Sequence, residues 1–156
     1  RVWPWKDHYY ALPRLGSPLL RSRDGITGFR RASRSPFDHD SAFRDIRHVA
    51  VRIDGAALTV FYTRIGDAPE HLCCTTLDMS GDWETWRATP PTPVLYPERD
   101  YEGATLPVGP SQRGAATSAE HAVRDPAVYA ENGMLYLLYS VAGERGIAIA
   151  TLRAVA

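Results

Sequence analysis

The amino-acid sequence predicts an all-β fold, and three observations support this prediction. Short runs rich in Val, Leu, Tyr and Phe, residue types that favour strands, alternate with turn residues along the chain. The 12 Pro and 12 Gly residues are scattered between these runs, and helix signals are poor. Asp54-Gly55 and Asn132-Gly133 are strong hairpin signals, because glycine adopts a positive φ at no steric cost.

A repeat in the sequence divides the expected strands into units. Residues 47–66 align without a gap to residues 124–143, at a shift of 77 residues (from 47 to 124). A strand-like run that ends in Thr-Leu follows each copy, at residues 72–77 and 147–152. The identical pairs are Arg47 and Arg124, Ala50 and Ala127, Val51 and Val128, Leu58 and Leu135, Tyr62 and Tyr139, and Gly66 and Gly143.

A fainter third copy lies upstream. Residues 8–12 match residues 58–62 at a shift of 50 residues (from 8 to 58), and Gly16 then aligns with Gly66. Each copy reads as strand, turn, strand, turn, strand, with room for a fourth strand. We therefore expect one domain, 1–156, built from three units at approximately residues 1–35, 44–90 and 100–156.

Repeats of about 50 residues, each an antiparallel meander, are typical of the four-stranded blades of β-propellers. A β-sandwich is the alternative, but it does not explain a gapless repeat. Because propellers have about four to eight blades, three units predict part of a propeller that another segment or a second chain completes. Residues 87–123 lack a regular pattern, and we expect a functional loop, a linker or a further strand there.

Composition excludes several classes of partner. Lys+Arg and Asp+Glu both number 18, and this balance argues against a nucleic-acid or membrane-surface partner. The longest apolar run, 134–142, is far shorter than the about 20 residues that cross a bilayer. Cys73 and Cys74 are adjacent and should not pair, which favours a reducing, cytoplasmic compartment. No motif indicates a cofactor or metal site, and a structural calcium in the channel is left open.

Two candidate residues occupy the same place in the repeat. His48 follows Arg47, and Asp125 follows Arg124, each at the start of an expected innermost strand. Innermost strands line the central channel of a propeller, so we expect His48 and Asp125 to face one cavity. A histidine there could exchange protons near neutral pH, and a carboxylate beside an arginine should stay ionised. The alternative is a structural pair and a packed histidine.

A third candidate lies in the irregular segment. Glu102 stands in Tyr101-Glu102-Gly103, directly after Asp100 and among prolines. Cleavage of a glycosidic bond usually needs two carboxyl groups, one ionised and one protonated. We expect Glu102 and Asp125 to form that pair, and the alternative for Glu102 is a solvated loop carboxylate.

These motifs resemble a known group of enzymes. The run 124–129, followed by Asn132-Gly133 and 136–140, resembles the blades of five-bladed propeller glycosidases, the group of glycoside hydrolase families 43 and 32. The pair Glu102-Gly103 is similar to the acid motif of family 43. The resemblance covers about residues 40–152 and implies that an Asp at the place of Asp125 stabilises the transition state or tunes the acid.

The resemblance implies a glycoside hydrolase-like protein that acts on a carbohydrate at the channel mouth. Glu102 would be the acid, and His48 an auxiliary acid/base or sugar ligand. No residue matches the base or nucleophile that these enzymes place in the first blade, and this favours the alternatives. These are a non-catalytic propeller that binds a carbohydrate or a protein, and a purely structural module. The expected substrate-binding residues are Arg47, Arg124, Asp100 and Tyr101.

Overall fold

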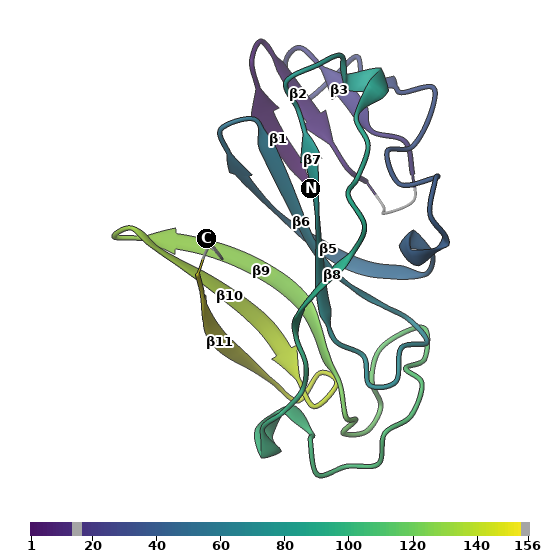
Figure 1. Ribbon diagram of the computed structural model, residues 1–156, viewed down its shortest axis with the longest axis vertical. Helices are drawn as coiled ribbons and strands as arrows, with labels where there is room; N and C mark the ends of the chain where they lie inside the picture. Colours follow the sequence, from purple (N-terminus) through teal and green to yellow (C-terminus); the bar gives the residue numbers. More distant parts are fainter. Residues whose placement is uncertain (14–16, 154–156) are drawn as a thin grey trace.

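The computed structural model describes residues 1–13 and 17–153, which form three antiparallel sheets (Figure 1). The first sheet contains β1 (Val2–Trp5), β2 (His8–Ala11), β3 (Leu20–Ser22) and β4 (Arg30–Arg31). The second contains β5 (Ile46–Asp54), β6 (Ala57–Arg64), β7 (Leu72–Asp78) and β8 (Thr92–Leu95), and the third contains β9 (Val123–Glu131), β10 (Met134–Val141) and β11 (Gly146–Leu152). Three short 3₁₀ helices are η1 (Ser41–Phe43), η2 (Trp83–Thr85) and η3 (Asp100–Glu102).

The all-β prediction is confirmed. In each sheet the spatial order of the strands follows the chain, as in a meander. Among the described residues the three sheets do not close into a propeller (Figure 1). Strand β8 arises from the proline-rich part of the segment 87–123, and it pairs only with β7, at an edge where a proline costs no ladder hydrogen bond. No helix in the described part of the chain is long and apolar enough to cross a membrane.

Both predicted hairpins form. Gly55, with φ of 55°, is the first of two loop residues between the paired residues Asp54 and Ala57. In the other hairpin Asn132 and Gly133 have φ of 51° and 76°. Positive φ at both loop positions is the geometry of a type I′ turn, whose twist matches that of the flanking strands.

The upstream repeat is displaced by one residue from the sequence-based alignment. His8 pairs with Trp5 across a two-residue loop, just as Ala57 pairs with Asp54. His8 therefore corresponds to Ala57, a shift of 49 residues (from 8 to 57) and not 50. The slip matters because successive strand residues point to opposite faces of a sheet. Hydrophobic similarity could not detect it, since the two hairpin loops have different sequences, and Gly16 lies outside the described residues.

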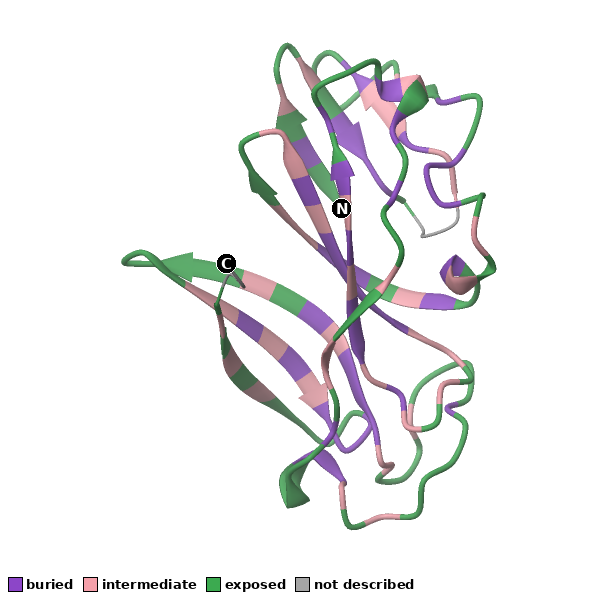
Figure 2. Ribbon diagram, in the orientation of Figure 1, coloured by how far each residue is buried: buried purple, intermediate pink, exposed green. Residues whose placement is uncertain are grey.

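The second sheet is buried on both faces (Figure 2). Val60 and Tyr62 of β6 point toward the first sheet, where they join a core that contains Tyr10 and Trp86. Alternate residues of the same sheet point the other way and pack against the third sheet. This second core contains Ala50, Phe61, Leu72, Val123, Leu137, Tyr139 and Val141.

The adjacent cysteines follow this alternation. Cys73 belongs to the core shared with the first sheet, and Cys74 packs against the core shared with the third. Both are free thiols, as the sequence predicts. Burial raises the pKa of Cys73 to about 11, so this thiol stays protonated and unreactive near neutral pH.

Candidate functional site

Two equivalent β-bulges form the centre of the candidate site. In β5 three residue steps from Ile46 to Val49 lie opposite two steps of β6. In β9 the three steps from Arg124 to Ala127 likewise lie opposite two steps of β10. Each bulge adds one residue at the same place in the repeat, and such bulges re-aim side chains at functional sites. Residues 48 and 125 lie in these two irregular stretches.

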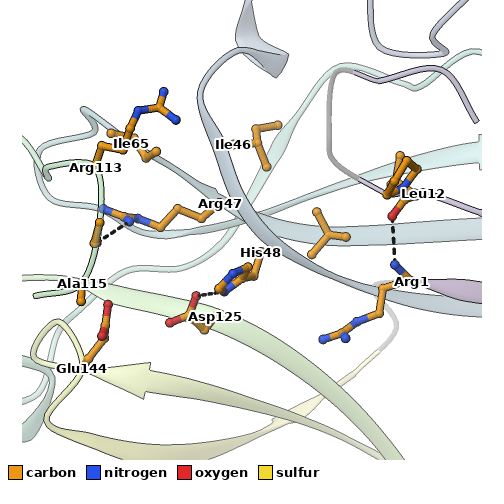
Figure 3. Close-up of a pocket in the computed structure, with 13 residues that line it drawn as sticks. Arg1, Leu12, Ile46, Arg47, His48, Ile65, Arg113, Ala115, Asp125 and Glu144 are labelled. Carbon is orange, nitrogen blue, oxygen red and sulfur yellow. Dashed lines mark hydrogen bonds and ion pairs between the residues drawn. The ribbon is translucent and has the colours of Figure 1, made fainter.

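The bulges bring His48 and Asp125 together (Figure 3). His48 Nδ1 and Asp125 Oδ1 are 2.8 Å apart, with the ring nitrogen as donor. Ser140 Oγ donates to the other carboxylate oxygen of Asp125 at 3.3 Å. Asp125 has φ of 49°, a left-handed conformation that is uncommon outside glycine and that Asp adopts more readily than most residues. The His48 side chain is 83% exposed, so a ligand can reach the ring.

A cavity of about 760 Å³ borders this pair. Its walls come from all three sheets and their connections: Leu12 follows the first sheet, 46–49 lie on β5, Asp125 lies on β9, and Glu144 lies on the β10–β11 connection (Figure 3). The connection between β8 and β9 adds residues 113–115. The cavity therefore joins a histidine, two carboxylates and several guanidinium groups on one surface, which suits a polar ligand rich in hydroxyl groups.

A buried glutamate holds the two repeat arginines. Glu70 is fully buried, and its two oxygens accept from Arg47 Nε at 2.7 Å and from Arg124 Nε at 2.8 Å. Thr63 Oγ1 also donates to Glu70, at 2.7 Å. Arg47 comes from the second sheet and Arg124 from the third, so this cluster, the Glu70 clasp, ties the two sheets together behind the cavity.

The two arginines differ in their access to the cavity. Arg47 lines it and donates to the backbone oxygens of Gln112 and Gly114, which anchors the β8–β9 connection at the cavity wall. Arg124 is 1% exposed, does not line the cavity, and also pairs with Glu120. Arg47 therefore lies at the cavity wall with its side chain 9% exposed and its guanidinium nitrogens donating within the protein, whereas Arg124 lies in the protein interior.

Glu102 does not reach the cavity. Its Oε2 accepts from the backbone N–H groups of Glu98 and Arg99, at 2.8 and 2.9 Å. Tyr139 donates its hydroxyl to Oε1 at 2.6 Å, and burial together with this bond raises the pKa of Tyr139 well above its usual range. Gly103 is needed here, because its φ is 87° and a Cβ would lie 2.3 Å from the Glu120 carbonyl oxygen. The Glu-Gly pair thus builds a tight turn with a buried, fully bonded carboxylate.

The neighbours of Glu102 are also outside the cavity. Asp100 and Tyr101 begin η3, and both side chains are exposed to solvent. Of the seven residues that the sequence singles out, the structure thus brings Asp125, His48 and Arg47 to the cavity and leaves Arg124, Glu102, Asp100 and Tyr101 away from it.

Two acidic residues outside the predicted site become prominent in the structure. Glu70 carries no motif, and only its position between two repeat arginines in space shows its role. Glu144 lines the cavity on the β10–β11 connection, where its Oε1 accepts from the Ala116 N–H at 3.2 Å. Glu144 follows Gly143 as Asp67 follows Gly66, and this recurrence in the sequence favours a structural or rim position. Within residues 1–13 and 17–153, no three His, Cys, Asp or Glu side chains gather as metal ligands would.

Comparison with known proteins finds a relative by sequence and a solved structure with a similar fold. No family model matches the chain. In an alignment that covers 93% of this chain, it is 37% identical to "Uncharacterized protein R118" of Acanthamoeba polyphaga mimivirus. A solved structure of BT0996, described as an RGII complex, superposes on 88% of this chain with a TM-score of 0.53 and 16% identity, a likeness that shows the fold alone. The chain spans 43% of the mimivirus protein and 35% of the solved protein.

Proposed function

We propose that this chain is a glycoside hydrolase-like protein that acts on a carbohydrate in the 760 Å³ cavity. The observation that supports this most is the pairing of His48 with Asp125 at two equivalent bulges on the cavity wall. A histidine bonded to a carboxylate is a common proton-transferring arrangement. The fold likeness to a structure described as an RGII complex gives further, weaker support for a carbohydrate ligand.

In this proposal Asp125 is the carboxylate that stabilises the positive charge of the oxocarbenium-like transition state. His48 exchanges a proton with the leaving oxygen or with the attacking water, since its ring is exposed and fixed by Asp125. The exposed Arg113 would bind hydroxyl or carboxylate groups of the sugar. Arg47 would hold the cavity wall in place through its bonds to Glu70 and Gly114.

The second carboxyl group in this proposal is Glu144 and not Glu102. Glu144 lines the same cavity as Asp125, and its side chain is partly exposed. Glu102 is buried and already accepts three hydrogen bonds from its own chain, so it has little capacity left to donate a proton to a substrate. Because cleavage of a glycosidic bond usually needs two carboxyl groups, Asp125 and Glu144 form that pair in this proposal.

The test is turnover of a panel of nitrophenyl glycosides by the wild-type chain and by three variants. Asp125→Asn and Glu144→Gln should each lower kcat by about 10²-fold or more, the usual effect of removing a general acid, base or stabilising carboxylate. Asp54→Asn is the matched control, because Asp54 is an exposed carboxylate of β5 at the hairpin far along the strand from the bulge. Full turnover by Asp125→Asn would exclude the proposed chemistry.

A second function is favoured by the position of Glu102. Glu102, the residue that resembles the general acid of glycoside hydrolase family 43, lies outside the cavity. The cavity could therefore bind a carbohydrate without cleaving it. A non-catalytic carbohydrate-binding module would bind sugars in calorimetry yet turn over no glycoside, and Asp125→Asn would change affinity only. Binding of sugars without turnover would therefore select this function over hydrolysis.

A further inference from the structure

The third sheet has an apolar face without a partner among the described residues. Strands β9, β10 and β11 each contribute to it, and Figure 2 shows exposed positions along β9 and β11. Ile147 and Ile149 are 78% and 60% exposed, although both are large aliphatic residues in a sheet. We call this surface the outer face of the third sheet; its apolar members are Tyr129, Met134, Tyr136, Leu138, Ile147 and Ile149.

The outer face of the third sheet corresponds, in the repeat, to the face of the second sheet that packs on a neighbouring sheet. Phe61 pairs with Cys74 in the second sheet, and Leu138 pairs with Ile149 at the same place in the third. Two residues before Cys74 stands Leu72, and two before Ile149 stands Ile147. In the second sheet Phe61, Leu72 and Cys74 pack against the third sheet. The outer face of the third sheet is therefore an unoccupied copy of a surface that elsewhere in this chain receives a sheet.

The first sheet presents the matching surface. Its face toward the second sheet contains Tyr10. Because successive strand residues point to opposite faces, Tyr9 and Ala11, on either side of Tyr10, lie on the other face. The register gives Tyr9 and Ala11 the same places in the first sheet that Leu58 and Val60 have in the second. Leu58 and Val60 are residues through which the second sheet packs on the first sheet. Val2, Pro4 and Tyr9 of this outer face of the first sheet are exposed.

We propose that copies of this chain associate head to tail, with the outer face of the first sheet of one copy packed on the outer face of the third sheet of another. Strands β1, β2, β10 and β11 contain no Lys, Arg, Asp or Glu. The register places a charged residue on each outer face, Arg31 of β4 on the first sheet and Glu131 of β9 on the third, and their charges are opposite in sign. The contact repeats the packing that already joins the first sheet to the second and the second to the third. One chain therefore holds both halves of a heterologous interface.

Two variants and their mixture test the proposal. Ile149→Lys places a charge on the outer face of the third sheet, and Val2→Lys places one on the outer face of the first. Light scattering with size-exclusion chromatography, over a concentration series, should give the wild-type protein a mass above its 17.3 kDa monomer. Each variant alone should associate at least about tenfold more weakly, since a charge buried without a partner is costly.

The mixture distinguishes this arrangement from a symmetric one. An equimolar mixture of Ile149→Lys and Val2→Lys should form a dimer, because each variant keeps the face that the other needs. Val108→Lys is the control, since Val108 is exposed on the β8–β9 connection outside both faces, and it should associate like the wild type. Circular dichroism verifies that every variant is folded.

Two results would overturn the proposal. A wild-type protein that is monomeric at every concentration would exclude self-association. Loss of association in Ile149→Lys but not in Val2→Lys would show that two third sheets pair with each other, without any contribution from the first.

Discussion

The second and third sheets are built from the same repeat, yet they differ in what surrounds them. Both have a hairpin, a bulge at the start of the first strand, and the same pairing between their first two strands. The second sheet has four strands and is buried on both faces, whereas the third has three and is buried on one. The pairing therefore follows the repeated sequence pattern, while burial depends on which sheets lie alongside.

The bulges show the same contrast at a single position. Residue 48 is a histidine with an exposed ring, and residue 125 is an aspartate in the left-handed conformation. The backbone irregularity is common to both sheets, but the side chains are different and bond to each other. A repeated scaffold thus brings two unlike groups to one cavity, which neither sheet could do alone.

The largest expected effect comes from the Glu70 clasp, which joins the two sheets. Glu70→Ala leaves the guanidinium groups of Arg47 and Arg124 without their buried counter-charge. The free energy of unfolding should fall by about 3–5 kcal/mol, as measured in denaturant titrations. Glu144→Ala, which removes a partly exposed carboxylate 3.6 Å from Arg124, should cost at most about 1 kcal/mol. If Glu70→Ala lowered the free energy of unfolding as little as Glu144→Ala does, the clasp would not hold the two sheets together.

An intermediate effect separates equivalent positions of the two sheets. Leu72 is fully buried between the sheets, and Ile147 occupies the same place on the outer face of the third sheet. Leu72→Ala should lower the free energy of unfolding by about 2–5 kcal/mol. Ile147→Ala should change it by less than about 0.5 kcal/mol when unfolding is followed at low protein concentration. Equal losses would contradict the difference in burial between the two sheets.

The smallest effect distinguishes the two bulges by their backbone. Asp125→Val forces a β-branched residue into a left-handed conformation and should cost about 1–3 kcal/mol of unfolding free energy. Asp125→Asn should cost less, because Asn adopts this conformation more easily. His48→Val is the matched substitution in the second sheet and should be nearly neutral, since His48 is exposed. A neutral Asp125→Val would show that this bulge is not strained.

Much of the fold could be predicted because it depends on local pattern. The gapless repeat located the second and third sheets, and the two glycine hairpins follow from a turn geometry that few residues adopt. The meeting of His48 with Asp125 was also predictable, since equivalent positions of neighbouring repeats face the same side. The register of the first sheet was not, because a one-residue slip leaves the hydrophobic similarity almost unchanged.

The candidate site was harder to predict. Glu102 matched a motif, but its surroundings make it a buried acceptor in a tight turn. Glu70 matched none, and its role appears only when Arg47 and Arg124 are placed in space. For Glu144 the recurring glycine before it indicated a rim position, but only the structure shows which cavity it lines. The function of a carboxylate depends on the groups within a few ångströms of it, and a linear sequence does not contain these distances.

By itself, the sequence determined that this chain folds into antiparallel meanders, and that the bulge positions of two of them hold a histidine and an aspartate. Strand alternation and turn chemistry are local, so they can be read along the chain. Only the tertiary structure decided which carboxylates line the cavity, which are buried in ion pairs, and which sheet face lacks a partner among the described residues. These features arise between segments far apart in the chain, where packing and charge pairing choose among arrangements that the local pattern permits equally.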